Sequence, residues 1–381
     1  MSARTIRMVI AGGGTGGHLQ PAVGAVEELR ARGVELDLLW IGSHDGVERA
    51  GAESVGARYA SVATGKFRRY LDPKTLVDSG RIPVGMIQAR RLLRAFRPDV
   101  VCSTGGFVSV PTVVATRGIA PVLTHEQTTV IGLATRINMP FSTVLALTFE
   151  SCTSQANSYR GRVVVTGNPV RASLLSGDAE CGRAAFGFGP ELPVLLVTGG
   201  ARGATPINTR VAAILPELLE TAQVLHQTGV AEANNDAAML RAAQATWPER
   251  LQRRYVVREF IREELADVYA MADVILGRAG AGTVATLGVL GIPSILIPLT
   301  PTTGDEQTRN ARSLGDVGAA VVLPQQDATP ERLRRELVAV LGDPARRAAM
   351  HAAALSVGKP DAAAKLADEL IRLADLGRKS V

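Results

Sequence analysis

Cysteine, aromatic residues and an excess of charge of one sign are all scarce in this 381-residue sequence. The three cysteines, Cys102, Cys152 and Cys181, are odd in number and lack Cys-x-x-Cys spacing, which excludes a disulfide framework or a cysteine-based zinc site as the organising feature. The 42 basic and 36 acidic residues leave a net charge of only +6, and no nucleic-acid partner is expected. With 46% hydrophobic residues, the composition is that of a globular protein.

A membrane-spanning run is also lacking. The stretch from Ala279 to Gly304 is uncharged, but Pro293, Pro298 and Pro301 interrupt it, which favours a helix, a turn and a buried strand. No signal peptide is recognisable at the N-terminus. We therefore expect a protein of the cytoplasm without a transmembrane segment.

Short Val-, Ile- and Leu-rich runs alternate with longer helical patterns along the whole chain. Such continuous apolar runs are typical of parallel strands covered by helices on both faces. The sequence predicts an α/β protein with two doubly wound, Rossmann-like domains. Two domains are expected because a chain of this length exceeds the usual size of one hydrophobic core. The expected strands form two sets of six: Ile6–Ala11, Leu36–Ile41, Val100–Ser103, Val122–Thr124, Val144–Ala146 and Val163–Val165, then Val194–Val197, Val224–Gln227, Tyr255–Val257, Val274–Leu276, Ser294–Ile297 and Ala320–Leu323.

Turn signals place the expected domain boundary between Gly167 and Pro193. We predict an N-terminal domain over residues 1–166, a C-terminal domain over 167–345, and C-terminal helices over 346–381, the last of which packs back on the first domain. Open α/β sheets bind ligands at the carboxyl ends of their strands, so two facing domains would hold a ligand in the cleft between them.

Three glycine-rich turns follow predicted strands, beginning at Gly12, Gly199 and Gly280. Glycine turns expose backbone N–H groups, and the following helix N-terminus favours an anion. The first also satisfies Gly-x-Gly-x-x-Gly, as in a dinucleotide-binding dehydrogenase, but the acidic residue expected at the end of the second strand is missing. Together the three turns favour a phosphate-bearing ligand.

His18 directly follows the first glycine turn, where an imidazole could act as a general base near neutral pH or could cap its own helix. His125, Glu126 and Gln127 form a second polar cluster after another strand. No Asp-x-Asp and no set of residues with metal-ligand spacing occurs, so we expect neither a metal ion nor another cofactor.

These motifs resemble the MurG family of glycosyltransferases, GT-B enzymes of glycosyltransferase family 28. The matching stretches, in the family's order and over nearly the whole chain, are Gly13-Gly14-Thr15-Gly16-Gly17-His18, Gly105-Gly106-Phe107-Val108-Ser109, His125-Glu126-Gln127, Gly167-Asn168-Pro169-Val170-Arg171, Gly199-Gly200 with Gly203-Ala204, Arg278 with Gly280-Ala281, and Gln307 with Asn310-Ala311.

The resemblance implies an inverting, metal-independent transfer of N-acetylglucosamine from UDP-N-acetylglucosamine to the muramyl sugar of lipid I, which yields lipid II for peptidoglycan. It implies that His18 is the catalytic base and that Arg171 neutralises charge on the departing UDP. It also implies that the backbone of Ile261 contacts uracil and that Gln307 forms a hydrogen bond with the donor sugar. The full set of implied substrate-binding positions is Thr15, Gly16, Gly17, Gly106, Glu126, Thr128, Arg171, Ala201, Arg202, Ile261, Ala281, Gly282, Thr283, Val284, Thr286 and Gln307.

Four of these positions, in three stretches of the chain, depart from the family pattern. Thr128 stands where the family has Asn, Ala201-Arg202 replace Ser-Gln, and Thr286 takes the place of a Glu that binds the ribose hydroxyls. Three readings remain open: the same reaction, a related transferase with another sugar-nucleotide donor or another lipid-linked or natural-product acceptor, and a catalytically silent scaffold.

Basic and apolar residues are interleaved between Arg58 and Arg97, and this segment contains ten basic residues but only two acidic ones. Such a segment suits an anionic membrane surface, although the part from Arg90 to Arg97 is equally typical of a solvated helix face. Because the family's acceptor is a polyprenyl pyrophosphate lipid, we expect a peripheral protein on the cytoplasmic side of the cell membrane, with the segment Lys66–Ile87 as the contact.

The departure at Arg202 gives a first prediction. If its guanidinium replaces the lost phosphate contact, Arg202→Ala should weaken UDP binding by about tenfold or more, because a hydrogen bond to a charged group contributes about 1.5–3 kcal/mol. Titration calorimetry measures this, and an unchanged dissociation constant would refute the role given to Arg202.

Overall fold

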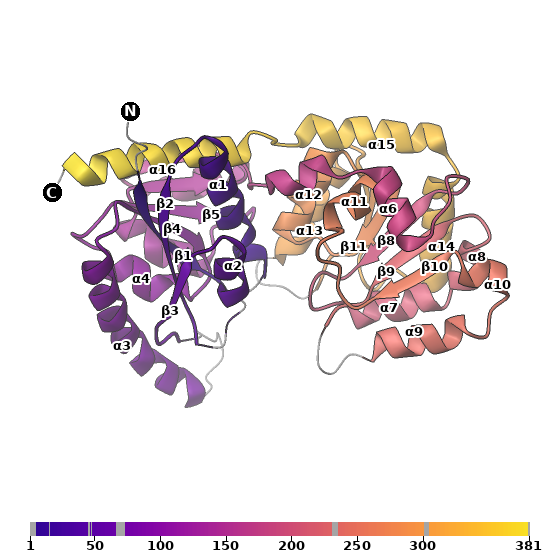
Figure 1. Cartoon of the computed structure of the whole chain (residues 1–381), viewed down its shortest axis with the longest axis horizontal. Coiled ribbons are helices and arrows are strands. Elements are labelled where there is room, and N and C mark those ends of the chain that lie inside the picture. Colours follow the sequence, from indigo (N-terminus) through magenta and orange to yellow (C-terminus); the bar gives the residue numbers. More distant parts are fainter. Residues whose placement is uncertain are drawn as a thin grey trace. The chain divides into compact units, whose positions relative to one another are not determined.

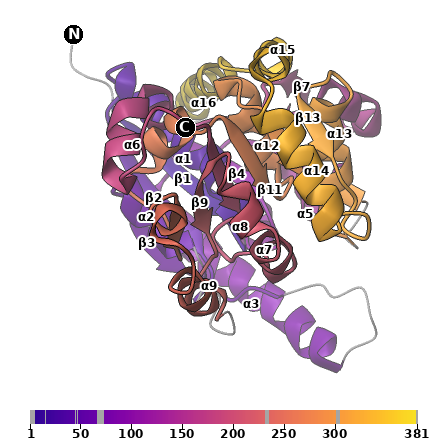
Figure 2. The ribbon, with the colours of Figure 1, turned by 90° about the vertical axis from the view of Figure 1, so that its right-hand side faces the viewer.

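A computed structural model describes residues 5–14, 16–44, 46, 48–65, 73–230, 235–300 and 305–379. The chain forms two compact units, one of residues 1–172 with 359–381 and the other of residues 173–358. Both are α/β units built on a fully parallel sheet (Figures 1 and 2). Among the described residues, no helix is long and apolar enough to cross a membrane.

The first unit has seven strands in the order β3-β2-β1-β4-β5-β6-β7. Side chains alternate along β1, so that Met8 and Ile10 enter one core and Val9 and Ala11 the other, as expected for a sheet covered on both faces. The elements of this unit are β1 (Ile6–Gly12), η1 (Gly16–His18), α1 (Gln20–Ala31), β2 (Leu36–Gly42), α2 (Glu48–Ser54), β3 (Arg58–Ser61), α3 (Pro73–Phe96), β4 (Val100–Gly105), α4 (Ser109–Ala115), β5 (Val122–Glu126), α5 (Leu133–Asn138), η2 (Met139–Phe141), β6 (Val144–Leu147), η3 (Glu150–Ala156), β7 (Arg162–Val165) and α16 (Ala362–Lys379).

The second unit has six strands in the order β10-β9-β8-β11-β12-β13. Leu195 and Val197 of β8 face one core, and Val194 and Leu196 face the other. Its elements are α6 (Ala179–Phe186), β8 (Val194–Thr198), α7 (Thr205–Ala212), α8 (Leu215–Leu218), β9 (Gln223–Gln227), α9 (Asp236–Gln244), α10 (Glu249–Gln252), β10 (Tyr255–Arg258), α11 (Leu265–Met271), β11 (Val274–Gly277), α12 (Ala281–Leu290), β12 (Ser294–Leu296), α13 (Glu306–Gly315), β13 (Ala320–Val322), α14 (Pro330–Leu341) and α15 (Pro344–Val357), and η4 (Ala172–Ser176) precedes them.

Counted within each unit, both sheets have the same strand order, 3-2-1-4-5-6, and the first sheet adds a seventh strand. This order reverses direction between β1 and β4 and between β8 and β11. Ligands of open α/β sheets bind at the carboxyl ends of the strands beside such a reversal. The fold therefore directs attention to the turns that follow these four strands.

The prediction of six strands in the first half was wrong by one, because β3 was missed. This edge strand has only four residues, with Arg58 exposed and the others partly buried, so it lacks the apolar run of a central strand. Arg58 is held at its surface position by Asp37, 2.8 Å away, and by the ring of Phe96.

The helices at the C-terminus divide between the two units. α15 packs beside α12 in the second unit, whereas α16 packs along α1 in the first (Figure 1). Leu366, Leu370 and Leu373 of α16 are fully or almost fully buried in the core beneath β1. The boundaries between the two units follow Ala172 and Gly358. The boundaries expected from the sequence followed residues 166 and 345.

Candidate active site

The turns after β1 and β4 meet at the carboxyl edge of the first sheet, where Gly12 pairs with Gly105. The ring of His18, at the end of η1, lies against the backbone of Gly105 and Gly106. A Cβ on Gly105 would be 3.7 Å from Nδ1 of His18, and one on Gly106 would be 3.3 Å from its Cδ2. Both glycines have positive φ, which favours glycine at the end of β4, and a Cβ on Gly106 would also overlap the carbonyl oxygen of Gly13.

The environment of His18 favours its neutral form. Burial lowers the pKa of the imidazole below its usual value, while Glu126, the backbone of Thr104 and Glu48 act in the opposite direction. Nδ1 is buried and makes no well-aligned hydrogen bond with any described residue. A neutral ring at pH 7 can accept a proton, as a general base must.

The cluster His125-Glu126-Gln127 ends β5, and each side chain fixes a different loop. Nε2 of His125 lies 3.0 Å from the carbonyl oxygen of Gly167, and Gln127 donates to the carbonyl of Thr104 at 2.7 Å. The His125 imidazole is fully buried, and burial lowers its pKa. Both bonds tie neighbouring turns together at the sheet edge.

Glu126 organises the loop that follows it. Its carboxylate accepts bonds from the N–H and hydroxyl of Thr128 at 3.2 and 3.0 Å and from the N–H of Gly132 at 2.9 Å. The Thr128 hydroxyl also lies 2.7 Å from the carbonyl oxygen of Val130. The side chain of Thr128 is therefore engaged within its own loop.

Arg171 follows β7 in the motif that begins at Gly167. Its Nε is buried without a hydrogen-bond partner, and it forms no ion pair with any other described residue. Both polar side-chain atoms of Asn168 are likewise buried without a partner in the described part of the chain. Unsatisfied buried donors of this kind mark a place where a ligand or water completes the bonding.

In the second unit, Gln227 joins neighbouring turns as His125 and Gln127 do in the first. It is the last residue of β9. Its amide nitrogen donates to Thr198 Oγ1 at 3.1 Å and to the Gly200 carbonyl at 3.3 Å, and its oxygen accepts the N–H of Ile261 at 3.0 Å. One side chain thus joins the glycine turn after β8 to the segment after β10. The N–H of Ile261 can serve a ligand only if its bond to Gln227 breaks.

Helix α12 starts at the carboxyl end of β11 without a side-chain cap, since its N-cap is Gly280. By contrast, Asp178, Thr329 and Asp343 cap the helices α6, α14 and α15 with their side chains. The first N–H groups of α12, over residues 281–283, therefore remain open to an anion.

Thr286 lies one turn further along α12 and is buried. Its hydroxyl donates to the carbonyl oxygen of Gly282 at 2.9 Å, which is four residues back in the same helix. A single hydroxyl that already donates to a carbonyl cannot form hydrogen bonds with two ribose hydroxyls as a carboxylate would.

Further predicted positions lie on α13 and in the turn after β8. Gln307, on α13, accepts the N–H of Leu299 at 3.0 Å. Ala201 and Arg202 are exposed in the turn after β8, where the Ala201 carbonyl accepts the N–H of Val230 at 3.0 Å. Thr15 lies outside the described residues.

Two further residues were missed by the sequence reasoning, Gln227 and Glu48. Glu48 is fully buried at the start of α2, and its carboxylate accepts the N–H of Gly14 at 2.5 Å. It lies six residues beyond β2, which is why a search for an acidic residue at the strand's end passed over it. In the described residues, no group of three or more His, Cys, Asp or Glu side chains is arranged to hold a metal ion.

Comparison with known proteins agrees with this geometry. The family model of the glycosyltransferase family 28 N-terminal domain matches residues 8–146, and that of the C-terminal domain matches residues 194–366. Curated relatives carry the name UDP-N-acetylglucosamine--N-acetylmuramyl-(pentapeptide) pyrophosphoryl-undecaprenol N-acetylglucosamine transferase. The one from Desulforudis audaxviator is 34% identical over 98% of this chain and 100% of its own, and that from Geobacillus thermodenitrificans is 38% identical over 86% and 88%.

Solved structures extend the likeness to the fold. The crystal structure of Acinetobacter baumannii MurG has a TM-score of 0.70 at 25% identity and covers 96% of this chain and 99% of its own. A UDP-GlcNAc 2-epimerase from Neisseria meningitidis has a TM-score of 0.67 at 14% identity, over 96% of this chain and 100% of its own, a likeness of fold alone.

Two parallel α/β units with glycine turns at the carboxyl edges of their sheets define the class: a glycosyltransferase of the GT-B fold. The chain belongs to glycosyltransferase family 28. Family membership thus excludes the dehydrogenase alternative that the first glycine turn had raised.

The position of Gln227 gives a prediction with an internal control. Gln227→Ala removes the bonds that join two turns of the second unit, and we expect UDP to bind about tenfold more weakly, since each lost bond costs about 1 kcal/mol. Calorimetric titration of UDP measures this change.

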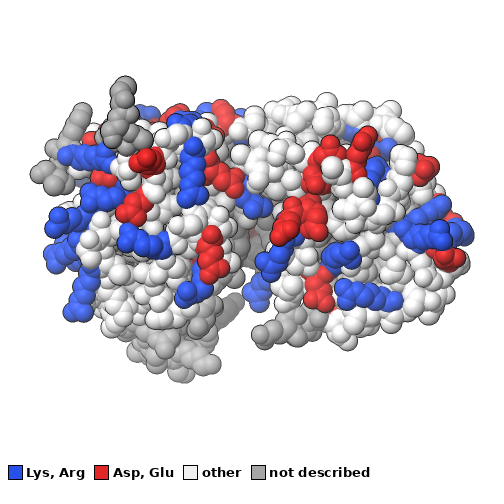
Figure 3. All heavy atoms as spheres, viewed as in Figure 1, with Lys and Arg blue, Asp and Glu red and all other residues white. Residues whose placement is uncertain are grey.

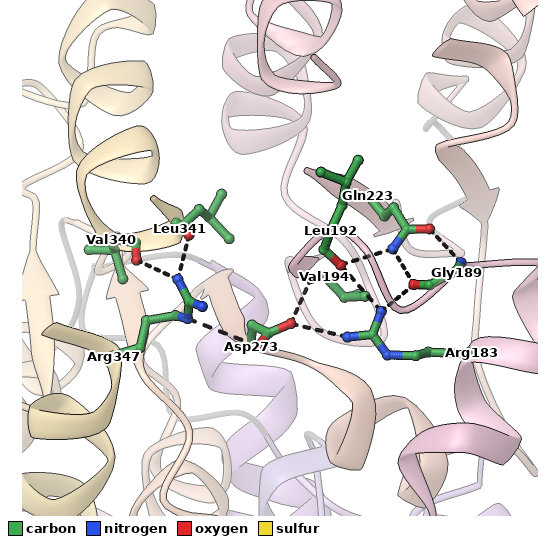
Figure 4. Close-up of polar contacts among 9 residues, drawn as sticks. All are labelled: Arg183, Gly189, Leu192, Val194, Gln223, Asp273, Val340, Leu341 and Arg347. Atoms are coloured by element: carbon green, nitrogen blue, oxygen red, sulfur yellow. Dashed lines mark hydrogen bonds and ion pairs between the residues drawn. The ribbon is translucent and has the colours of Figure 1, made fainter. Parts of the chain in front are cut away.

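Gln223, at the opposite end of β9, supplies the matched variant. It bonds Gly189 and Leu192 beside the cluster of Asp273, Arg183 and Arg347 (Figure 4). Gln223→Ala should lower the unfolding temperature but leave the UDP dissociation constant unchanged. Equal effects of the two variants on UDP binding would contradict the assignment.

Proposed function

We propose that the protein transfers N-acetylglucosamine from UDP-N-acetylglucosamine to the muramyl sugar of lipid I, which produces lipid II for peptidoglycan synthesis. The observation that carries this proposal is the relationship over the whole chain to transferases named for this reaction. The geometry around His18 and α12 supports it.

The donor binds at the carboxyl edge of the second sheet in this proposal. The open N–H groups at the start of α12 and the guanidinium of Arg202 face the diphosphate, and the amide of Gln307 bonds the sugar. Arg171, which has no ion pair among the described residues, neutralises charge on the leaving UDP. Preorganised donors of this kind can stabilise a leaving diphosphate without a metal ion.

The acceptor binds at the first sheet, with its pyrophosphate on the glycine turn that precedes His18. The neutral imidazole takes the proton of the acceptor hydroxyl, and we assign this to Nε2 because Nδ1 is buried. The hydroxyl oxygen then forms a bond to the anomeric carbon as the bond from that carbon to the phosphate oxygen breaks. UDP departs with the electron pair, and the anomeric configuration inverts.

The bonding of Thr286 and Thr128 favours a second candidate, a related transferase with another sugar-nucleotide donor or acceptor. Both hydroxyls are engaged internally where the family places ribose and sugar contacts. Turnover of UDP-N-acetylglucosamine measured beside UDP-glucose and UDP-N-acetylgalactosamine decides between the two. Preference for another donor would favour the second candidate.

The role of His18 gives a direct prediction. His18→Ala should lower kcat by about 10²- to 10⁴-fold, the usual contribution of a general base, while UDP still binds. A radiolabel assay with UDP-N-acetylglucosamine and a lipid I analogue measures this. Because the pKa of His18 is lowered, the wild-type rate should fall on acidification only below about pH 6.5.

His44 is a suitable control, since its side chain is exposed and its ring bonds Ser61 of β3 at 2.9 Å. His44→Ala should keep the wild-type rate. Retention of full activity by His18→Ala would exclude the proposed base.

We also propose that the first unit binds the surface of an anionic membrane, on its cytoplasmic side. Most of the predicted contact, residues 66–72 and the side chains of 73–81, lies outside the described residues. The described part of α3 presents Val84, Ile87, Arg91 and Arg94 at helical spacing, all exposed. Basic side chains gather on the side of this unit where α3 lies (Figure 3).

Sedimentation with liposomes tests this surface. The double variant Arg91→Glu and Arg94→Glu should reduce binding to phosphatidylglycerol vesicles by about tenfold or more, because each basic residue contributes about 1 kcal/mol. Arg334→Glu with Arg335→Glu on α14 makes the same charge change elsewhere and should keep binding nearly intact. Wild-type binding that is independent of anionic lipid would remove the proposal.

A further inference from the structure

Glu48 is a carboxylate placed wholly out of water beside the proposed site. It is the first residue of α2 and has no exposed surface. A buried carboxylate is costly unless donors surround it. Here Oε1 accepts the N–H of Gly14 at 2.5 Å, and Oε2 accepts the hydroxyl of Ser43 at 3.1 Å.

The chain on both sides is shaped to admit this carboxylate. A Cβ on Gly13 or on Gly46 would overlap its oxygen atoms. The two glycines lie on different loops, one after β1 and the other after β2. Glu48 therefore fills a space that two glycines leave open and joins the two loops through its hydrogen bonds.

The same glycine turn leads directly to His18. On its other side the carbonyl oxygen of Gly13 packs so closely against Gly106 that a Cβ there would overlap it, and Gly106 in turn lies against the His18 ring. The turn is thus held between Glu48 on α2 and the loop after β4. Loss of the carboxylate would release one side of this arrangement.

We propose that Glu48 is a positioning residue, which fixes the first glycine turn and thereby the place and the surroundings of the His18 ring. The inference rests on the proposed function, in which His18 is the base. Glu48 itself touches no substrate in this role. Its bond to Gly14 also occupies one N–H of the turn, so a bound phosphate uses the remaining ones.

Glu48 also acts on His18 through its charge, which raises the pKa of the imidazole less than Glu126 does. The groups that face the ring are Glu126 and His125 from β5, the backbone of Thr104 from β4, and Glu48 from α2. Both carboxylates raise the pKa of His18 against the effect of burial, and the pair of imidazoles disfavours a second charge. Removal of the Glu48 charge should therefore lower the pKa of His18 further.

Two variants separate the hydrogen bond from the charge. Glu48→Gln keeps an acceptor for Gly14 but removes the charge, so it should shift the pKa of His18 downward. Glu48→Ala removes both, and kcat should fall by at least about tenfold, more than in Glu48→Gln. Ser43→Ala removes one bond but no charge, so it should leave the pKa of His18 unchanged.

The measurement is an NMR titration of the imidazole signals in histidine-labelled full-length protein, with His18 assigned as the signal missing from His18→Gln. The titration does not require an active enzyme. Failure of lipid I glycosylation would therefore overturn the proposed function, whereas the titration would still test the role of Glu48. An unchanged His18 pKa in Glu48→Gln, or wild-type kcat in a folded Glu48→Ala protein, would overturn the proposal. If Glu48→Ala fails to fold, the comparison of Glu48→Gln with Ser43→Ala decides.

Discussion

Each sheet of this protein reverses its strand order between the first and fourth strands of its unit, and the rest of the site depends on that constraint. At the reversal, the crossover helices leave in opposite directions and cover opposite faces, so the two turns above it are free to bind a ligand. In the first unit these turns carry Gly12 to His18 and Gly105 to Gly106. Their mutual packing brings an imidazole to the edge of the sheet.

The polar groups at the carboxyl edges of the two sheets serve mainly to hold loops in place. Glu126 and Gln127 in the first unit and Gln227 in the second each form hydrogen bonds with neighbouring turns. Glu48 does the same from a fully buried position. The groups left unsatisfied, such as Arg171 and the N-terminus of α12, are those that suit a diphosphate. Among the described residues, the structure thus separates side chains that build the turns from groups that are left without an internal partner.

The three departures from the family pattern acquire a physical meaning in this setting. The hydroxyls of Thr128 and Thr286 satisfy carbonyl or carboxylate groups within a few residues of themselves, so both substitutions are locally stable. Arg202 is exposed in the turn after β8 and adds a positive charge there. Under the proposed mode of donor binding, a loss of polar contacts to the sugars alongside a gain of charge near the phosphates would shift recognition of the donor toward its diphosphate.

The sequence by itself determined the two parallel sheets, because buried parallel strands are continuous apolar runs and each glycine turn follows one of them. It also pointed to His18, Glu126 and Arg171, which occur in motifs beside those turns. The tertiary structure alone decided the edge strand β3, whose four residues lack an apolar run. It alone revealed Glu48 and Gln227, because their partners lie 34 residues away along the chain and no local pattern records a bond between distant loops.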